Sequence, residues 1–202
     1  MNRAVWLYVG VLATVLVSFA GLVTIPQIQL GALEPVVDEE GREHPVAPTG
    51  LVAEGRRVYK GLGCMYCHSQ QVRPPGFGAD LDRGWGVRRT IARDHIYDQP
   101  PLLGTMRTGP DLANIAVRQP SDNWHLLHLY NPQITSAGSN MPPFSFLFEA
   151  RPVEVEVPYD ALQFPPDWQI PDVVVGPTGD AKALVAYLKS LDASYPVPEI
   201  VP

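Results

Sequence analysis

The chain has 202 residues, of which 46% are apolar, so it is long enough for one domain with its own core. Its 22 prolines predict much irregular backbone. The formal net charge of −6 argues against nucleic-acid binding and leaves cationic partners possible.

The first expected element is a membrane-spanning helix at the N-terminus. No charged residue occurs from Ala4 to Ile25, and a helix of that length, about 33 Å, crosses a hydrocarbon core of about 30 Å. The alternative is a signal peptide cleaved after Ala20, but the apolar run continues beyond that residue. Arg3 before the span and the mostly acidic segment 34–44 after it predict a cytoplasmic N-terminus, with the rest of the chain outside.

Short helices separated by loops are expected after the span. Residues 26–50 contain four prolines and show no periodicity, which predicts a linker. A helix should begin at Thr49 or Gly50 and place its apolar residues on one stripe up to Leu62. Residues 69–112 are rich in Arg, Gly and Pro and predict ordered loops with short turns.

Two more helices are expected in the second half. Ser121 is a good N-cap for a helix that Asn131-Pro132 ends, and an amphipathic helix should begin at Gly179 or Asp180. The helix before the cysteines and the last helix each carry Gly or an aromatic residue on the apolar face, so we expect them to cross closely. Residues 149–177 could include a short strand at VEVEV, or be an insertion wrapped on a partner.

The two cysteines of the chain stand in the pattern Cys64-x-x-Cys67-His68. This pattern is typical of covalent haem attachment, in which two thiols add to the vinyl groups on one haem edge and the next imidazole reaches the iron. A thioredoxin-like pair would need a βαβ pattern, which the sequence lacks. A zinc site remains an alternative, with His125 and His128 as the other two ligands.

A c-type iron usually takes a second axial ligand, and methionine suits electron transfer. We choose Met141, which lies in a proline-stiffened loop 73 residues after His68. Met106 is the other methionine available, because Met65 lies between the haem cysteines. His125 or His128 as the sixth ligand is a further alternative.

Four motifs follow the N-terminal anchor in order: GCMYCHSQQVRP, IYDQPPLLGTMRTGPDL, SDNWHLLHLYNP and SNMPPFSFL. With these motifs the chain resembles the membrane-anchored mono-haem cytochrome c subunit of cbb-type (C-family) haem-copper cytochrome c oxidases. The resemblance covers roughly residues 50–147 and the anchor. It implies an all-α fold, with one transmembrane helix followed by a class I cytochrome c domain that has long irregular proline-rich loops.

The resemblance also implies an organisation and a set of site residues. The anchor would be residues 1–28, the linker 29–50 and the mono-haem domain 51–202, in which 149–177 has no counterpart that aligns. One haem c would be held covalently by Cys64 and Cys67, with His68 and Met141 as iron ligands. The Pro110 carbonyl would accept the Nδ1 proton of His68. Arg73, Arg107 and Trp124 belong to the motifs, and the two arginines are candidates to pair with the haem propionates.

The implied function is electron transfer without an active site of the chain's own. The haem would relay electrons to the haem-copper catalytic subunit of a respiratory oxidase in a bacterial cytoplasmic membrane, with the haem domain on the outer side. Expected partners are that subunit, other membrane subunits, other cytochromes c and membrane lipid. Alternatives are the equivalent subunit of a nitric oxide reductase or another membrane oxidoreductase, a free-standing anchored shuttle, and a structural module that binds a metal through Cys64, Cys67, His125 and His128.

Overall fold

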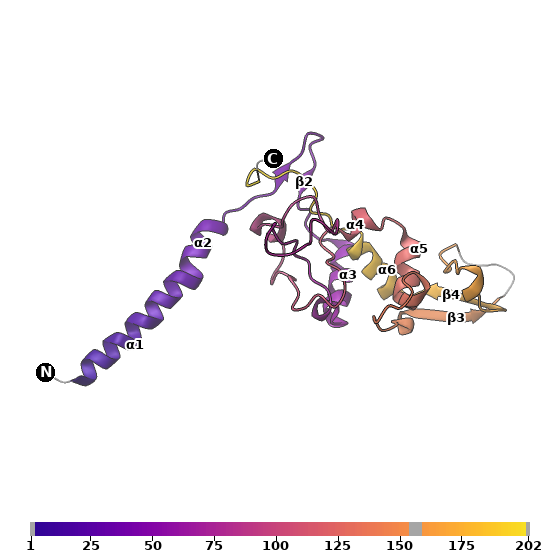
Figure 1. Cartoon of the computed structure of the whole chain (residues 1–202), viewed down its shortest axis with the longest axis horizontal. Helices are drawn as coiled ribbons and strands as arrows, with labels where there is room; N and C mark the ends of the chain where they lie inside the picture. The colour runs from indigo at the N-terminus through magenta and orange to yellow at the C-terminus, as the bar shows by residue number, and fades with distance from the viewer. Residues whose placement is uncertain (1–2, 154–158, 201–202) are drawn as a thin grey trace. The chain divides into compact units, whose positions relative to one another are not determined.

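The computed structural model describes residues 3–153 and 159–200. It divides into two compact units, one of Met1–Pro45 with Ile91–Ile96 and one of Val46–Thr90 with Tyr97–Pro202 (Figure 1). Each unit is described by itself below.

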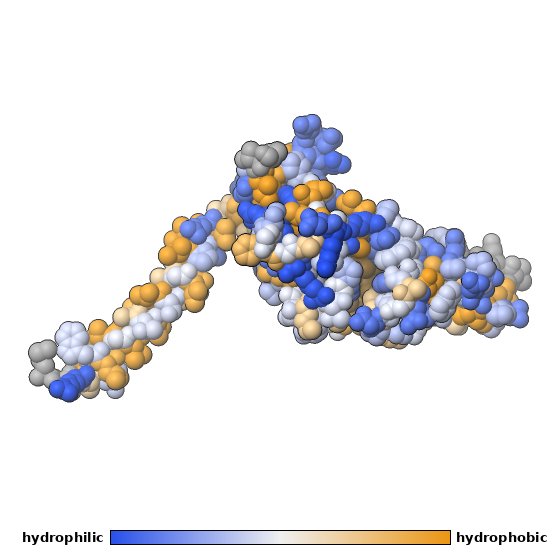
Figure 2. All heavy atoms as spheres, viewed as in Figure 1, coloured by the Kyte–Doolittle hydropathy of each residue, from blue (hydrophilic) through white to orange (hydrophobic). Residues whose placement is uncertain are grey.

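The first unit begins with a continuous helical rod. It consists of α1 (Arg3–Phe19), a π-helical turn (Ala20–Thr24) and α2 (Ile25–Leu30). Within the segment Arg3–Leu30, an 18-residue window has a mean hydropathy of 2.2. The surface of the segment is largely apolar (Figure 2). At 1.5 Å per residue it is about 42 Å long. It is therefore long and apolar enough to cross a membrane, and it extends five residues further than the predicted span.

The π-helical turn explains why the rod continues past a proline. Pro26 stands near the start of α2 and has no N–H to donate, and its ring would crowd the carbonyl four residues earlier. In the structure the N–H of Ile25 instead bonds to the carbonyl of Ala20, five residues back. A widened turn of this kind accommodates a proline inside a helix.

The rest of the first unit contains a small sheet that the sequence did not predict. Strands β1 (Val36–Val37) and β2 (Glu43–His44) pair antiparallel. Asp38 holds the connecting turn, because its carboxylate accepts from Arg42 Nε at 2.7 Å. Residues 26–50, for which a linker was expected, therefore contain the end of the helical rod and this short sheet.

The second unit is built around two crossing helices. These are α3 (Gly50–Gly61), which follows the N-cap Thr49, and α6 (Gly179–Leu188). A Cβ on Gly55 would lie 1.8 Å from the carbonyl oxygen of Ala183, so only glycine allows this approach. The close crossing predicted from the sequence is confirmed.

Shorter helices complete the second unit. α4 (Ile115–Arg118) precedes α5 (Asp122–Tyr130), whose N-cap Ser121 accepts a hydrogen bond from the N–H of Trp124 at 3.3 Å, as predicted. Short 3₁₀ turns cover Cys64–Tyr66, Pro132–Ile134, Ser145–Leu147 and Pro166–Trp168, and the first unit has one at Ala92–His95. The core packs side chains of α3, α5 and α6 together, including Val58, Tyr59, Leu127, Leu129, Leu184 and Leu188.

A second hairpin departs from the all-helical expectation. Strand β3 (Phe148–Pro152) pairs antiparallel with β4 (Val173–Pro177), with Phe148 opposite Pro177. Of the predicted strand VEVEV, residues 154–157 lie outside the described residues. The ladder therefore brings both ends of the segment 149–177 together beside α6, since β4 leads into that helix.

Candidate functional site

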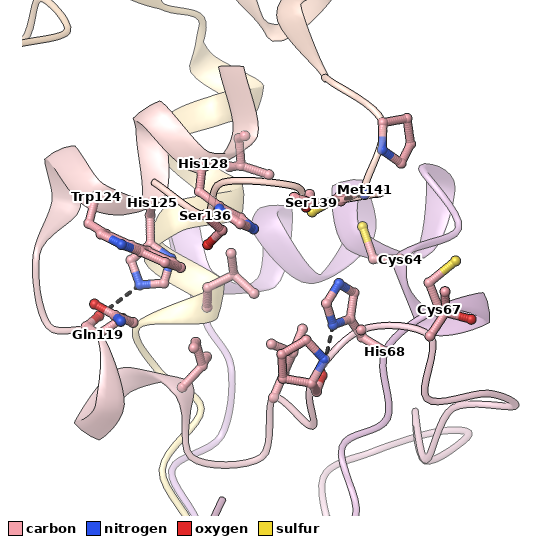
Figure 3. A pocket seen from close by; sticks show the side chains of 18 of the residues that line it. Cys64, Cys67, His68, Gln119, Trp124, His125, His128, Ser136, Ser139 and Met141 are labelled. Atoms are coloured by element: carbon pink, nitrogen blue, oxygen red, sulfur yellow. Dashed lines mark hydrogen bonds between the residues drawn. The ribbon is translucent and has the colours of Figure 1, made fainter. Parts of the chain in front are cut away.

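The second unit encloses a cavity of about 490 Å³ (Figure 3). The walls come from the loop after α3, the segment 108–119, α5, the loop 136–142 and α6. Six of the residues predicted for the site contribute to its lining: Cys64, Cys67, His68, Pro110, Trp124 and Met141.

The two cysteines lie in a tight turn directly after α3. Gly63 takes a left-handed conformation with φ of 73°, which turns the chain into the 3₁₀ segment, and the N–H of His68 closes the turn on the carbonyl of Cys64 at 2.9 Å. Both thiols are free, with Cys64 half-buried and Cys67 exposed. Burial raises the pKa of the Cys64 thiol to about 11. The turn therefore presents two free thiols and an imidazole at one end of the cavity.

His68 is oriented by a single strong contact. Its Nδ1 lies 2.8 Å from the carbonyl oxygen of Pro110. A carbonyl can only accept, so Nδ1 carries the proton and Nε2 keeps its lone pair. Burial lowers the pKa of His68, which favours the neutral ring, although the Pro110 hydrogen bond acts in the opposite direction.

Gly109 allows the chain before Pro110 to lie against the imidazole. A Cβ at Gly109 would stand 2.3 Å from Cε1 of His68. The N–H of Gly109 also donates to the carbonyl of Cys67 at 2.9 Å. Residues Gly109 and Pro110 are thus held against the cysteine turn by two hydrogen bonds, one from Gly109 to Cys67 and one between His68 and Pro110.

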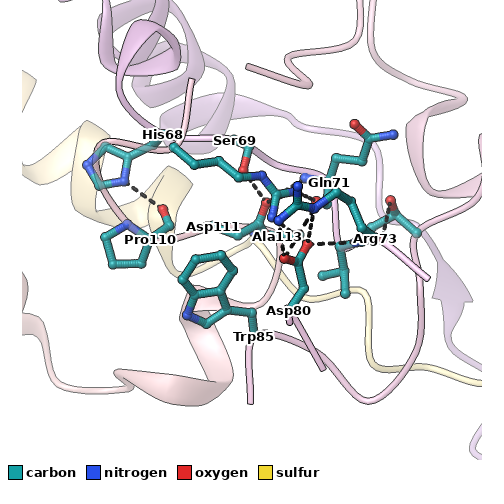
Figure 4. Close-up of polar contacts among 12 residues, drawn as sticks. His68, Ser69, Gln71, Arg73, Asp80, Trp85, Pro110, Asp111 and Ala113 are labelled. Atoms are coloured by element: carbon teal, nitrogen blue, oxygen red, sulfur yellow. Dashed lines mark hydrogen bonds and ion pairs between the residues drawn. The ribbon is translucent and has the colours of Figure 1, made fainter. Parts of the chain in front are cut away.

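Arg73 and Arg107, predicted as propionate partners, do not line this cavity. Both bind the carboxylate of Asp80, whose side chain is 0% exposed: Arg73 Nη2 donates to Oδ1 at 2.9 Å, and Arg107 pairs with Oδ2 (Figure 4). Burial opposes ionisation of Asp80, but the hydrogen bonds from the two guanidinium groups outweigh it and hold its pKa well below its usual range. Both arginines are therefore ion-paired with the buried carboxylate of Asp80.

The loop 136–142 brings Met141 to the cavity. The main-chain N–H of Met141 donates to Ser139 Oγ at 3.2 Å, and the side chain is half-buried. In Figure 3 the side chain of Met141 faces the cavity from a different segment than His68 does. The described structure thus offers a thioether and an imidazole to the same space.

The two histidines of α5 have partners of their own. Nε2 of His125 donates to the carbonyl of Gln119 at 2.8 Å, and Nδ1 of His128 lies 2.6 Å from Thr135 Oγ1. The ring of His128 stacks on Trp124, with centroids 4.7 Å apart. Burial lowers the pKa of His128 to about 4, so its ring is neutral near pH 7.

The zinc alternative fails on this geometry. Within residues 3–153 and 159–200 there is no group of three or more His, Cys, Asp or Glu residues that could hold a metal ion. The four-ligand site of Cys64, Cys67, His125 and His128 is therefore not formed.

One residue of the cavity was missed by sequence reasoning. Arg118, at the end of α4, lines it. The available signal was a single cation in the otherwise uncharged run LANIAVRQ, but nothing in the sequence showed that this run faces the cavity.

The donor set suits an iron porphyrin. Two thiols stand beside an imidazole with an available Nε2, and a thioether faces the same cavity. The walls between them are mostly apolar, with Leu112, Ile115, Leu129, Leu184 and Leu188. A flat, largely apolar group with two reactive vinyl substituents fits this arrangement, with the cysteines at one of its edges.

Comparison with known proteins supports the same conclusion. No curated protein matches the chain. A family model described as "Cytochrome C oxidase, mono-heme subunit/FixO" matches residues 2–164. The match includes the apolar rod, the segment before α3 and the lining of the cavity up to Met141, and it reaches further toward the C-terminus than the resemblance over 50–147. The chain therefore belongs to the family of mono-haem subunits of cytochrome c oxidase.

Proposed function

We propose that the chain carries one covalent haem c and passes electrons to the catalytic subunit of a haem-copper oxidase. Cys64 and Cys67 would form the two thioether bonds, and His68 Nε2 and the Met141 sulfur would be the axial ligands. The observation that carries the proposal is the cavity in which two free thiols stand beside an imidazole whose Nδ1 is bound to the Pro110 carbonyl. Family membership supports one haem and an oxidase role.

Each residue then has a defined task. The contact with Pro110 fixes the tautomer and the ring angle of His68, and a proton held on Nδ1 by an acceptor strengthens Nε2 as a ligand. When bound, haem c supplies a one-electron ferric–ferrous couple. The apolar wall that includes Leu112, Leu129 and Leu184 would limit the access of water to the bound group. Because His68 and Met141 would both bind the iron, no position would stay open for a substrate, and the subunit would not itself be catalytic.

The proposal includes the fold and placement of the domain. We assign residues 51–202 to a class I cytochrome c domain, supported by the turn of Cys64, Cys67 and His68 directly after α3 and by the close approach of Gly55 to Ala183 on α6. Residues 1–28 would be the anchor and 29–50 the linker, in a bacterial cytoplasmic membrane. Arg3 and the acids after the rod support a cytoplasmic N-terminus, with the haem domain on the outer side.

Electron transfer needs a cofactor edge near the surface. Cys67 is exposed, and its neighbour Tyr66 is 62% exposed. Met106 is 60% exposed, and its segment is tied to the cysteine turn because the N–H of Thr105 donates to the carbonyl of Met65 at 3.2 Å. We place the approach of the haem-copper subunit and of other cytochromes c at this end of the cavity.

The test is purification of the full chain in mild detergent, followed by intact mass and a pyridine haemochrome spectrum. One added haem and a c-type band are expected, together with co-purification of a haem-copper subunit. The Cys64→Ala, Cys67→Ala double variant should lose the covalent haem. A wild-type chain that carries no haem would contradict the proposal. A haem-loaded chain that separates alone from the membrane would instead make it a free shuttle.

A further inference from the structure

The segment that carries Met141 has no charged side chain. No Asp, Glu, Lys, Arg or His occurs from Leu129 to Phe148, although 18% of the residues of the whole chain are charged. After α5 this segment forms the loop 131–147, called the uncharged loop below, and much of that loop is exposed. The second unit therefore presents an extended solvent-facing segment that itself contributes no ionised side chain.

Hydrogen bonds hold the uncharged loop in one conformation. The N–H of Ser136 donates to the carbonyl of Pro132 at 2.9 Å, and the N–H of Ser139 donates to the carbonyl of Ser136 at 3.1 Å. The second half of the loop is attached to α5, because the N–H of Phe144 donates to the carbonyl of Leu129 at 2.8 Å. A segment held in this way loses little conformational freedom when a partner binds, which favours association.

The uncharged loop exposes a large aromatic side chain. Phe146 is 65% exposed, and its ring centroid lies 5.8 Å from that of Phe144. Phe144 in turn packs against the core of the unit. Pro142 and Pro143 precede this pair and are exposed as well. Aromatic rings are enriched in protein–protein interfaces, and a ring supported from below in this way is suited to be an interface anchor.

The uncharged loop is also a thin wall of the cavity. Five of its residues both line the cavity and are exposed to solvent: Ser136, Ala137, Gly138, Asn140 and Pro142. A single layer of mostly small residues therefore separates the interior of the cavity from the surface at this loop. Electron tunnelling slows exponentially with distance, so a partner bound here would lie close to a cofactor in the cavity.

The lack of charge on the loop indicates a permanent partner. Transient partners such as soluble electron donors are steered by complementary charges, and their binding depends on salt. Subunits that stay together instead bury surfaces depleted in charged residues, because a buried charge without a partner is costly. The chain belongs to a family of cytochrome c oxidase subunits, so a lasting contact with another subunit of an oxidase is expected.

We propose that the uncharged loop is the docking surface for the haem-copper catalytic subunit, with Phe146 as its anchor. This rests on the proposed function and makes it more specific, because it assigns one surface of the chain to one partner. The matching surface of the catalytic subunit is apolar and uncharged, since any ionised group there would lose its water without gaining a counter-charge from the loop.

The docking surface adjoins the approach proposed above for partner proteins. In Figure 3 Ser139 and Met141 lie toward the end of the cavity at which Cys64 is drawn. The catalytic subunit would take the uncharged loop, and Tyr66 and Met106 would remain exposed for other cytochromes c. Two partners can then bind at neighbouring surfaces of one cofactor, which a relay between them requires.

The test introduces one charge into the loop of the full chain, which is purified in mild detergent through a tag on that chain. Phe146→Glu places a carboxylate in the proposed contact. Phe77→Glu is the matched control, because Phe77 is 77% exposed on another loop of the same unit, and neither phenylalanine lines the cavity. The amount of catalytic subunit that co-purifies per haem c is measured. Phe146→Glu should lower it about tenfold or more, since a buried unpaired charge is costly, and Phe77→Glu should leave it unchanged.

The haem content separates an interface effect from misfolding. Phe146→Glu should keep the covalent haem and the visible spectrum of the wild type. If it does not mature, Phe146→Ser takes its place and should give a smaller loss of catalytic subunit. An unchanged amount of catalytic subunit in the variant that matures overturns the assignment, and so does an equal loss in Phe77→Glu.

Two further outcomes have distinct meanings. A Phe146→Glu chain that changes only its self-association would show that the loop joins two copies of the chain, which also overturns the assignment to the catalytic subunit. A wild-type chain without covalent haem, or without any co-purified catalytic subunit, would overturn the proposed function itself and this surface with it. That failure is seen in the wild type and not in the variants, so the two failures are distinguishable.

Discussion

The carboxylate of Asp111 accepts a hydrogen bond from the hydroxyl of Ser69 at 2.6 Å and so ties the segment after the cysteine turn to the segment after Pro110 (Figure 4). The same carboxylate accepts from the main-chain N–H groups of Gln71 and Ala113. Asp111 is 0% exposed. Because Pro110 precedes it directly, this junction also sets where the Pro110 carbonyl meets His68.

Removing that junction should destabilise the domain and loosen His68. Asp111→Ala would leave a buried hydroxyl and two buried or half-buried N–H groups without their acceptor, at about 1–3 kcal/mol each before relaxation. We expect the free energy of unfolding of the haem-loaded chain to fall by roughly 3 kcal/mol, measured by urea denaturation. Ser69→Ala removes only one of the three donors and should cost about 1 kcal/mol. Equal effects from both variants would contradict this account of the junction.

Asp80 predicts an acid-sensitive part of the stability. Its folded-state pKa is depressed, because the hydrogen bonds from Arg73 and Arg107 outweigh the effect of burial. A carboxyl group whose pKa is lower in the folded state than in the unfolded state stabilises the fold above its unfolded-state pKa, about 3.9. This stabilisation is lost as the pH falls through its folded-state pKa. Asp80→Asn should therefore cost on the order of 2–3 kcal/mol at pH 7, and its deficit relative to wild type should narrow below about pH 4.

The neighbouring Asp82 gives the matched control for Asp80. It is exposed and lies two residues further along the same loop. Asp82→Asn should leave urea unfolding unchanged at pH 7, within about 0.5 kcal/mol. A deficit of Asp80→Asn that stays constant from pH 7 to pH 3 would show that the ion pairs with Arg73 and Arg107 do not stabilise the fold.

The helices of the second unit were predictable because their signals are local. Apolar residues three and four apart indicate α3, and the N-cap Ser121 marks the start of α5, without knowledge of the rest of the chain. The hairpin of β3 and β4 was not predictable in this way. The ladder places Phe148 opposite Pro177, which is far from it in the sequence, and neither strand has an alternating pattern that would reveal its partner.

The site divides in the same manner. Cys64, Cys67 and His68 are fixed by a five-residue pattern, so their proximity follows from the sequence. Which arginine faces the cavity depends on the path of the loops over 69–118, which have no periodicity. Asp80 is equally hidden, because in GADLDRG nothing distinguishes the carboxylate that becomes buried from the exposed Asp82.

The crossing of α3 and α6 depends on one glycine. Gly55→Ala would place a methyl group 1.8 Å from the carbonyl oxygen of Ala183, and backbone atoms cannot rotate away as a side chain could. The helices would have to separate, and overpacking of this kind costs about 1–3 kcal/mol. We expect the free energy of unfolding to fall by about 3 kcal/mol in urea denaturation. Gly61→Ala, at the end of the same helix with nothing within 4 Å of its Cβ, should cause no loss. Similar losses from both would contradict the close crossing.

Met141 gives the most direct test of the axial ligands. Methionine opposite histidine raises the potential of a c-type haem, so Met141→Ala should keep the covalent haem, lower its potential and open a position that binds added imidazole. Met106→Ala is the control, because Met106 is also a methionine of a loop in this unit but is 60% exposed and does not line the cavity. Redox titration and visible spectra with and without imidazole measure both effects. If Met141→Ala keeps the wild-type potential and binds no imidazole, the second ligand is another residue of the same cavity, and His128 is the one to replace next, since its ring is neutral near pH 7 and it lines that cavity.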